Sequence, residues 1–281
     1  MNNIDVKKLI EKEINKKVEV INRFSGGMSN YTYLIKVNEQ LFTFRIPGKN
    51  SEVFINREIE KENLDLITKL NLNCENVYIN TLNGYKMSKY IEGEDLTNSK
   101  VDYYTVVEKL KQLHNSGIKA VNEYNKKERL DYYESLVSYK HNENYFELKN
   151  KMFKILEDYN NIELVFCHGD AQKANWLQSD SLYLLDWEYS GLNDPYYDIA
   201  CFGNVNFEDA IILLKHYLNK EPNNIEMNRL ILNRMFQCLQ WHNVAIYKEE
   251  IGLSKDLNID FKKVSEKYIV LAKELYEKIK M

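Results

Sequence analysis

Residues 164–188 read LVFCHGDAQKANWLQSDSLYLLDWE, and this stretch decides what fold and chemistry we expect. It contains two short apolar runs that predict strands, each followed by polar side chains. Asp170 stands on a tight loop after the first run and lies five residues before Asn175. Asp186 follows eleven residues later, directly after the second run. The pattern therefore places two carboxylates and one amide at strand ends and on a loop, where functional side chains are common.

These three side chains suit the transfer of a phosphoryl group. That reaction needs a carboxylate to orient the attacking hydroxyl and accept its proton, and oxygen ligands to hold Mg²⁺ against the phosphates. We expect Asp170 to be the base, and Asn175 and Asp186 to bind the metal. Taken alone, His168-Gly169-Asp170 would more often be a simple turn, and Asp186 a surface carboxylate. The spacing and the second strand favour the catalytic interpretation.

The composition is that of an ordinary globular protein. The 281 residues are 44% hydrophobic and 28% charged, with a net charge of −4. We therefore expect neither a disordered chain nor a basic nucleic-acid surface. The cysteines Cys74, Cys167, Cys201 and Cys238 are far apart and predict reduced thiols. The sequence has no signal-like or membrane-spanning apolar stretch, which predicts a cytoplasmic protein without membrane insertion.

The rest of the sequence predicts a small β-rich part followed by a larger helical part. From residue 101 the pattern is mostly helical, except for an embedded hairpin within 163–190. The expected fold class is α+β, with a nucleotide-binding lobe at residues 1–92 and a helical catalytic and acceptor-binding lobe at 93–281. In the first lobe we expect a helix at 4–16, strands at 18–24, 31–37 and 41–47, a helix at 52–70, and strands at 77–79 and 85–91.

The HxDxxxxN loop that ends at Asn175, together with Asp186, resembles the catalytic loop and metal-binding Asp of aminoglycoside-phosphotransferase-like kinases. The segment DWEYSGLNDPYYDIA at 186–200 is the more specific part. It is similar to the choline/ethanolamine kinase family, and to bacterial choline kinases above all. The resemblance covers roughly residues 20–250. It implies a two-lobed protein-kinase-like fold, with ATP and Mg²⁺ as cofactors.

The resemblance also implies an ATP site in the N-terminal lobe. Residues 25–30, SGGMSN, resemble the family's phosphate-covering hairpin loop, although two glycines alone more often mark a plain turn. Arg45 stands where protein kinases have a strand lysine, and the alternative is a solvated edge arginine. Glu58, Glu60 and Glu62 compete to be its partner, and the pattern favours Glu60. The expected ATP contacts are Ser25, Gly26, Gly27, Ser29, Asn30, Arg45 and Glu60, with Met87, Lys89 and Tyr90 beside adenine unless they form an ordinary strand end.

Other polar residues near these motifs are expected to serve the fold. We expect His168 to hydrogen-bond within the loop and His114 to be a satisfied core histidine. Lys173 is interpreted as a solvated loop lysine rather than a phosphate ligand. The resemblance implies that Asp198 supports the catalytic loop through hydrogen bonds and takes no direct part in catalysis.

A quaternary ammonium acceptor would be held by aromatic faces and nearby carboxylates. Choline kinases tend to carry a W-x-x-W-like pair in a late helix. Trp241 matches the second position, whereas Cys238 departs from the first, so the cage would need another aromatic residue or a smaller acceptor. Core packing is the alternative for Trp241. The expected acceptor contacts are Asp170, Glu188, Tyr189, Asp194, Tyr197 and Trp241.

The expected function is phosphorylation of the hydroxyl of choline to phosphocholine, with ATP as donor and Mg²⁺ as cofactor. Ethanolamine, thiamine and an aminoglycoside are alternative acceptors. A catalytically silent kinase-like binding protein is the alternative of a different class. Nothing in these motifs specifies an oligomeric state or a downstream pathway.

Overall fold

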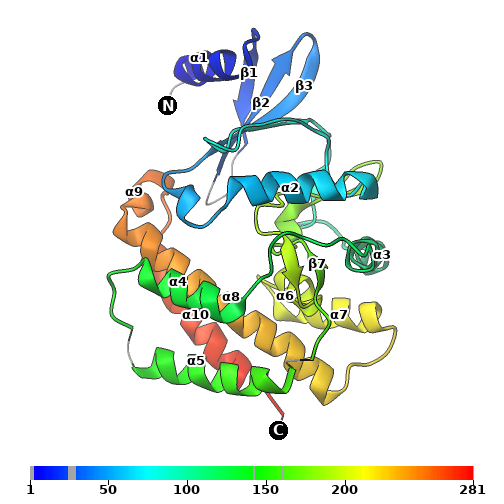
Figure 1. The fold of residues 1–281 in the computed structure, drawn as a ribbon, viewed down its shortest axis with the longest axis vertical. Helices are drawn as coiled ribbons and strands as arrows, with labels where there is room; N and C mark the ends of the chain where they lie inside the picture. Colours follow the sequence, from blue (N-terminus) through cyan, green and yellow to red (C-terminus); the bar gives the residue numbers. More distant parts are fainter. Residues whose placement is uncertain (1–2, 25–29, 142, 160, 281) are drawn as a thin grey trace. The chain divides into compact units, whose positions relative to one another are not determined.

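Contacts between residues divide the chain into two compact units. The computed structural model describes residues 3–24, 30–141, 143–159 and 161–280 (Figure 1). The first unit consists of residues 1–99 and 174–189, and the second of residues 100–173 and 190–281. The division into lobes at residues 1–92 and 93–281 stays a prediction.

An antiparallel sheet with the strand order β1-β2-β3-β5-β4 forms the centre of the first unit. β2 and β3 are joined by Asn38 and Glu39, whose positive φ angles of 47° and 64° match the two-residue turn that suits a twisted hairpin. α1 packs against this sheet through the buried Val6 and Ile10. The bounds are α1 Asn3–Ile14, β1 Glu19–Arg23, β2 Asn30–Val37, β3 Gln40–Pro47, β4 Asn76–Ile79 and β5 Lys86–Lys89.

α2 (Arg57–Ile67) is shorter than the helix expected at 52–70. It begins at Asn56, whose side chain accepts hydrogen bonds from the first backbone amides and so caps the helix. Short 3-10 turns at Ser51–Val53 and Thr68–Leu70 account for the rest of the expected helix. The buried positions of α2 are three or four residues apart, so one face of the helix is turned inward.

The two apolar runs at residues 163–168 and 182–187, which are expected to form a hairpin, do not pair with each other. β8 (Trp176–Gln178) and β9 (Leu182–Leu184) pair together and, with β6 (Glu94–Asp95), make a three-stranded sheet in the first unit. β7 (Val165–Cys167) pairs with β10 (Gly191–Asn193) in the second unit. The expected pairing is wrong because apolar runs predict strands but not their partners.

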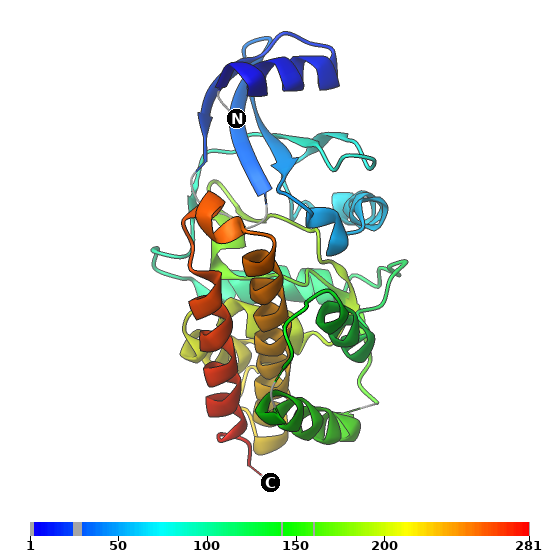
Figure 2. The same ribbon diagram turned by 90° about the vertical axis from the view of Figure 1, so that its left-hand side faces the viewer.

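The second unit is built around α8, a helix of 27 residues that is buried on most of its surface. A capping box between Asn223 and Glu226 fixes its start. α4, α5, α6 and α10 all contact α8, and Figures 1 and 2 both show α10 running beside it. The helix bounds are α3 Tyr103–His114, α4 Lys126–Ser135, α5 Glu143–Leu156, α6 Tyr196–Phe202, α7 Phe207–Leu218, α8 Asn224–Glu250, α9 Leu253–Leu257 and α10 Phe261–Tyr276.

The cysteines and the hydropathy of the helices are also the subject of sequence predictions. All four cysteines are buried and free, as expected for reduced thiols. Across the described ranges, no helix combines the length and the hydropathy that crossing a membrane requires.

A buried histidine in α8 makes stability depend on pH. Burial lowers the pKa of His242 from 6.5 to about 4, and the nearby His141 adds to this effect. Between these two values the unfolded chain binds a proton that the folded chain rejects, so stability falls as the pH drops from about 6.5 to 4. We expect a loss of about 3 kcal/mol in the free energy of unfolding from this residue.

The measurement is urea denaturation at pH 7 and pH 4.5 for the native protein and for His242→Gln. The variant should lose less stability on acidification, whereas a matched His216→Gln variant, at an exposed position in α7, should behave like the native protein. Equal losses for the native protein and His242→Gln would contradict this expectation.

Candidate active site

A buried arginine–glutamate pair lies at the centre of the first unit's polar residues. Arg45, on β3, donates from Nη1 and Nη2 to the two carboxylate oxygens of Glu60 at 2.6 and 2.8 Å. Glu60 is buried on α2, whereas Glu58 and Glu62 are exposed. The predicted pairing of Arg45 with Glu60 is therefore confirmed, and Arg45 is not a solvated edge residue.

Two further cations contact the same carboxylate. Lys86 Nζ lies 3.0 Å from Glu60 Oε1, and Arg57 Nη1 lies 2.7 Å from Oε2. Burial opposes ionisation of Glu60, but Lys86, Arg45 and Arg57 outweigh it and hold its pKa well below the ordinary value. Arg57 and Lys86 are not among the residues that the sequence predicts for this site. The only signal for Arg57 is its position three residues before Glu60, which is also common on exposed helix faces.

Glu188 belongs to this group of charges. Its Oε2 accepts hydrogen bonds from Arg57 Nη1 at 2.9 Å and from Asn30 Nδ2 at 3.1 Å, and it lies 3.5 Å from Arg45 Nη1. Because its charge is compensated inside the first unit, these contacts lend no support to the expected role of Glu188 beside a cationic acceptor. We refer to Arg45, Arg57, Glu60, Lys86, Asp186 and Glu188 together as the ion cluster.

The pairing of β8 with β9 brings Asn175 close to Asp186. Asn175 directly precedes β8, and its carbonyl oxygen accepts a hydrogen bond from the amide of Leu185 at 2.8 Å. Asp186 has a φ of 66°, a left-handed conformation that is uncommon outside glycine and is often found at functional sites. Its Oδ1 lies 3.6 Å from Arg45 Nη1, and 38% of its side chain is exposed.

Among the carboxylates of the ion cluster, Asp186 has the negative charge that nearby cations compensate least. Burial, followed by the charge of Glu188, raises the pKa of Asp186 to about 6. Its partial exposure lets water screen part of this effect. A carboxylate in this state would gain from a nearby cation, and carboxylate and amide oxygens are the hard ligands that Mg²⁺ prefers. Asn175 and Asp186 therefore fit a magnesium ion.

The loop that carries Asp170 follows β7 in the second unit. The amides of His168 and Gly169 donate to the two carboxylate oxygens of Asp198, each at 2.8 Å. The amide of Asp170 donates to His168 Nδ1 at 3.2 Å, and Gln172 Nε2 donates to Asp170 Oδ2 at 2.9 Å. The expectation that His168 and Asp198 support this loop through hydrogen bonds is confirmed.

His114 is buried on α3 behind the same carboxylate. Its Nε2 lies 3.1 Å from Asp198 Oδ2, and its Nδ1 lies 3.0 Å from the hydroxyl of Tyr217. Burial opposes ionisation of Asp198, but the hydrogen bond and charge of His114 outweigh it and lower the pKa of Asp198. His114 is thus a satisfied core histidine, as expected.

Lys173 differs from its expectation as a solvated loop residue. Its Nζ lies 2.7 Å from Asp209 Oδ2, and only 18% of its side chain is exposed. The local sequence does not show this partner, because Asp209 comes from α7, 36 residues further along the chain.

Among the residues expected to contact the acceptor, Asp194 is occupied by other groups. Arg229 donates to it from Nε and Nη2, with a shortest distance of 2.7 Å, and Asn233 Nδ2 donates at 2.9 Å. Burial opposes its ionisation, but Arg229 outweighs burial and lowers the pKa of Asp194. Its contacts therefore lend no support to a role beside a cation.

The aromatic residues of this set differ in burial. The Tyr197 hydroxyl lies 2.8 Å from that of Tyr124, which donates to Gln240, so Tyr197 is fixed by a buried network. Trp241, on α8, is partly exposed. Tyr189 is buried and belongs to the first unit.

The residues expected beside adenine lie at the end of β5. The amide of Lys89 donates to the carbonyl of Glu75 at 2.9 Å, and the amide of Tyr90 donates to that of Leu41 at 3.1 Å. Both backbone amides are thus already hydrogen-bonded within the first unit. Any backbone hydrogen bond from Lys89 or Tyr90 to adenine would therefore be made by a carbonyl oxygen. Met87 is buried. The remaining predicted phosphate contacts, Ser25, Gly26, Gly27 and Ser29, lie outside the described residues.

The sheet with its buried Arg–Glu pair and the helical unit with its Asp170 loop define a class of protein, the kinase-like phosphotransferases that act on an alcohol. Residues 21–227 match the model of the family described as choline/ethanolamine kinase. The chain therefore belongs to the choline/ethanolamine kinase family.

Similar proteins agree with this assignment. Protein LicA of Haemophilus influenzae is 32% identical over 249 residues, which cover 81% of this chain and 73% of that protein. The crystal structure of choline kinase LicA from Streptococcus pneumoniae superposes with a TM-score of 0.77 at 28% identity, over 95% of this chain and 99% of that one. LicA in complex with AMP gives a TM-score of 0.81 at 27% identity, over 98% and 99% of the two chains.

More distant structures share the fold alone. The GDP complex of an aminoglycoside 2'-phosphotransferase has a TM-score of 0.67 at 15% identity, over 96% of this chain and 99% of that one. The predicted α+β, two-lobed, protein-kinase-like fold is confirmed. The family and the AMP complex of LicA support nucleotide binding by this chain.

Proposed function

We propose that this chain is a choline kinase that transfers the γ-phosphoryl group of ATP to the hydroxyl of choline in the presence of Mg²⁺. The observation that carries the proposal is the family match over residues 21–227, a range that contains Asp170, Asn175 and Asp186. The similarity to the choline kinase LicA from Streptococcus pneumoniae supports choline over other alcohols. We expect the protein to act in the cytoplasm.

Asp170 acts on the acceptor. Its carboxylate orients the hydroxyl and accepts its proton while the hydroxyl oxygen forms a bond to the γ-phosphorus. The bond between that phosphorus and the oxygen bridging to the β-phosphate breaks, and ADP leaves with the bonding electrons. The hydrogen bonds that hold the Asp170 loop support this role, because a base must be fixed near the proton that it removes.

Arg45 contacts the phosphates of ATP. Glu60 holds its terminal nitrogens, while the buried Nε has no hydrogen-bond partner among the described residues. A buried donor without a partner is costly, and a phosphate oxygen would satisfy it. The proposed phosphate contacts are completed by Ser25, Gly26, Gly27, Ser29 and Asn30, and residues 87–90 are proposed to contact adenine.

Asn175 and Asp186 hold Mg²⁺ when it is bound. Such an ion would neutralise negative charge on the phosphates of ATP. The raised pKa of Asp186 supports this role, since a cation would relieve the repulsion from Glu188.

Asp186→Asn tests this assignment by removing the charge while keeping the shape. We expect the Mg²⁺ concentration for half-maximal activity to rise by about tenfold or more, because even indirect partners of a metal contribute 10–100-fold. A titration of Mn²⁺ by electron paramagnetic resonance, with a non-hydrolysable ATP analogue present, measures metal binding apart from turnover. Asp180→Asn, at an exposed position between β8 and β9, is the matched control. An unchanged affinity for Mn²⁺ in Asp186→Asn would exclude Asp186 as a ligand.

Aromatic side chains recognise the acceptor. Trp241 is partly exposed and can present a ring face to a quaternary ammonium group. Tyr197, which is buried and fixed by its hydrogen bonds, belongs to the proposed set as well. Tyr189, Asp194 and Glu188 complete the proposed set. Arginines already compensate the charges of Asp194 and Glu188, so these carboxylates do not select choline over other acceptors. Ethanolamine, thiamine and an aminoglycoside therefore stay as alternative acceptors.

The test of the acceptor is a comparison of kcat/KM for choline, ethanolamine, thiamine, homoserine and an aminoglycoside at saturating Mg²⁺-ATP. The proposal expects choline to give the highest value and Trp241→Ala to reduce it. A higher value for another alcohol would keep the kinase and replace choline. Nucleotide binding without turnover for any alcohol would favour the catalytically silent alternative.

A further inference from the structure

Arg57 contacts two of the three carboxylates that lie beside Arg45 in the ion cluster. It is the first residue of α2 and is 7% exposed. Its Nη1 donates to Glu60 Oε2 at 2.7 Å and to Glu188 Oε2 at 2.9 Å. We propose that Arg57 is a positioning residue for phosphoryl transfer, which fixes Glu60 and Glu188 so that Arg45 keeps the orientation needed to contact the phosphates. This inference rests on the proposed role of Arg45.

The two arginines share one oxygen of Glu60. Oε2 accepts from Arg45 Nη2 at 2.8 Å and from Arg57 Nη1 at 2.7 Å, while Oε1 accepts from Arg45 Nη1 and Lys86. Every donor on Glu60 thus helps to fix the plane of the carboxylate, and that plane sets the direction of the Arg45 fork. Without Arg57, Oε2 would be held by Arg45 alone and the carboxylate could rotate.

Charge balance leads to the same conclusion. The ion cluster contains three cations, Arg45, Arg57 and Lys86, and three carboxylates, Glu60, Glu188 and Asp186. Removing Arg57 leaves an excess of one negative charge, and Glu188 loses its shortest contact to a cation. Arg45 Nη1, already 3.5 Å from Glu188, would then be drawn toward Glu188 and away from Glu60.

The backbone at Gly84 packs closely against the Arg57 side chain and limits where that side chain can lie. Its φ is +73°, and a Cβ atom there would lie 2.8 Å from Arg57 Nε and 2.7 Å from Pro47 Cγ. The carbonyl of Gly84 accepts a hydrogen bond from Arg45 Nη2 at 3.2 Å. A single backbone position thus contacts both arginines and restricts their movement.

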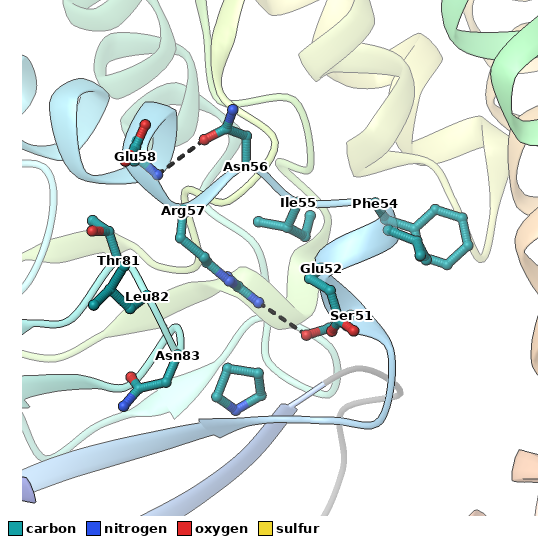
Figure 3. Close-up of a pocket in the computed structure, with 12 residues that line it drawn as sticks. Ser51, Glu52, Phe54, Ile55, Asn56, Arg57, Glu58, Thr81, Leu82 and Asn83 are labelled. Carbon is teal, nitrogen blue, oxygen red and sulfur yellow. Dashed lines mark hydrogen bonds between the residues drawn. The ribbon is translucent and has the colours of Figure 1, made fainter.

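A pocket of about 740 Å³ in the first unit gives small molecules access to Arg57. Figure 3 shows the Arg57 side chain reaching from the start of α2 toward Ser51, and Arg57 Nη2 lies 3.4 Å from Ser51 Oγ. The turn at residues 81–83 also lines this pocket. A guanidinium ion can therefore reach the place of a deleted Arg57 side chain, and this makes chemical rescue a suitable test.

The test compares Arg57→Ala and Arg57→Lys with the native chain, with and without guanidinium at concentrations far below those that unfold proteins. For Arg57→Ala we expect kcat/KM for ATP to fall by about 10²-fold, the scale of a misplacement near 1 Å. The KM for the acceptor should change little. Added guanidinium should restore at least about a tenth of the kcat/KM that Arg57→Ala loses. It should not raise kcat/KM of the native chain, since only the variant lacks the Arg57 side chain. Calorimetric titration with an ATP analogue should show the same loss and recovery in affinity.

Arg57→Lys keeps the charge but loses the planar fork, so it should fold and still lose about tenfold in kcat/KM for ATP. If Arg57→Ala does not fold, this variant decides the question. Native values for Arg57→Lys, or a folded Arg57→Ala that guanidinium does not rescue, would overturn the inference. Arg45→Ala in the same assay separates the two claims: if ATP affinity survives that change, the proposed role of Arg45 itself fails.

Discussion

Asp170→Asn should lower kcat by about 10²–10⁴-fold, the range that a positioned general base contributes. The amide cannot accept the proton of the attacking hydroxyl. It has the shape of the carboxylate and can still accept the hydrogen bond from Gln172, so the loop should keep its structure. ATP affinity and the thermal midpoint should therefore stay close to those of the native protein.

The measurement is acceptor-dependent ADP release, with nucleotide binding followed separately by calorimetry. Asp158→Asn, at an exposed position, is the matched control and should keep full activity. If Asp170→Asn kept more than about a tenth of kcat, the residue would not be the base, because even a modest base contributes more than that.

Glu60→Gln should cost about 3–5 kcal/mol in the free energy of unfolding, the scale on which a buried ion pair is broken by removing one partner. Glu60 is 1% exposed and neutralises charge from Arg45, Arg57 and Lys86. The neutral amide would leave these three cations without the anion between them. Its N–H₂ group is a hydrogen-bond donor and would face one of the cations, which are also donors. The KM for ATP should rise as well, since Glu60 also orients Arg45.

Urea denaturation of Glu60→Gln and of Glu62→Gln tests this expectation. Glu62 is exposed on the same helix, so its variant should stay within about 0.5 kcal/mol of the native protein. A similar small change for both variants would show that the ion cluster contributes little to stability.

The sequence predicted the parts of the site that lie within one local pattern. The loop around Asp170 was predicted because its residue types and spacing fit one reaction. The pairing of Arg45 with Glu60 is what the resemblance to the kinase family implies, with the glutamate on the helix after the strand, and the structure contains it. In both cases the relevant residues belong to neighbouring elements, so local spacing is informative.

What the sequence could not predict depends on contacts between distant segments. Glu188 meets Arg57 across 131 residues, and Asp194 meets Arg229 across 35. A charged residue on a helix looks the same in sequence whether its partner is buried or absent, so Arg57 was missed. The pairing of β7 with β10 was missed for a similar reason, since an apolar run does not specify its neighbour.

Phosphorus NMR of a reaction containing the protein, Mg²⁺-ATP and choline tests the central claim most directly. The claim predicts that the ATP resonances decline while ADP and phosphocholine appear in equal amounts, with no inorganic phosphate beyond that of a sample without protein. It also predicts that Asp170→Asn forms almost no phosphocholine. Unchanged ATP, or ADP accompanied only by inorganic phosphate, would contradict the claim that this chain phosphorylates choline.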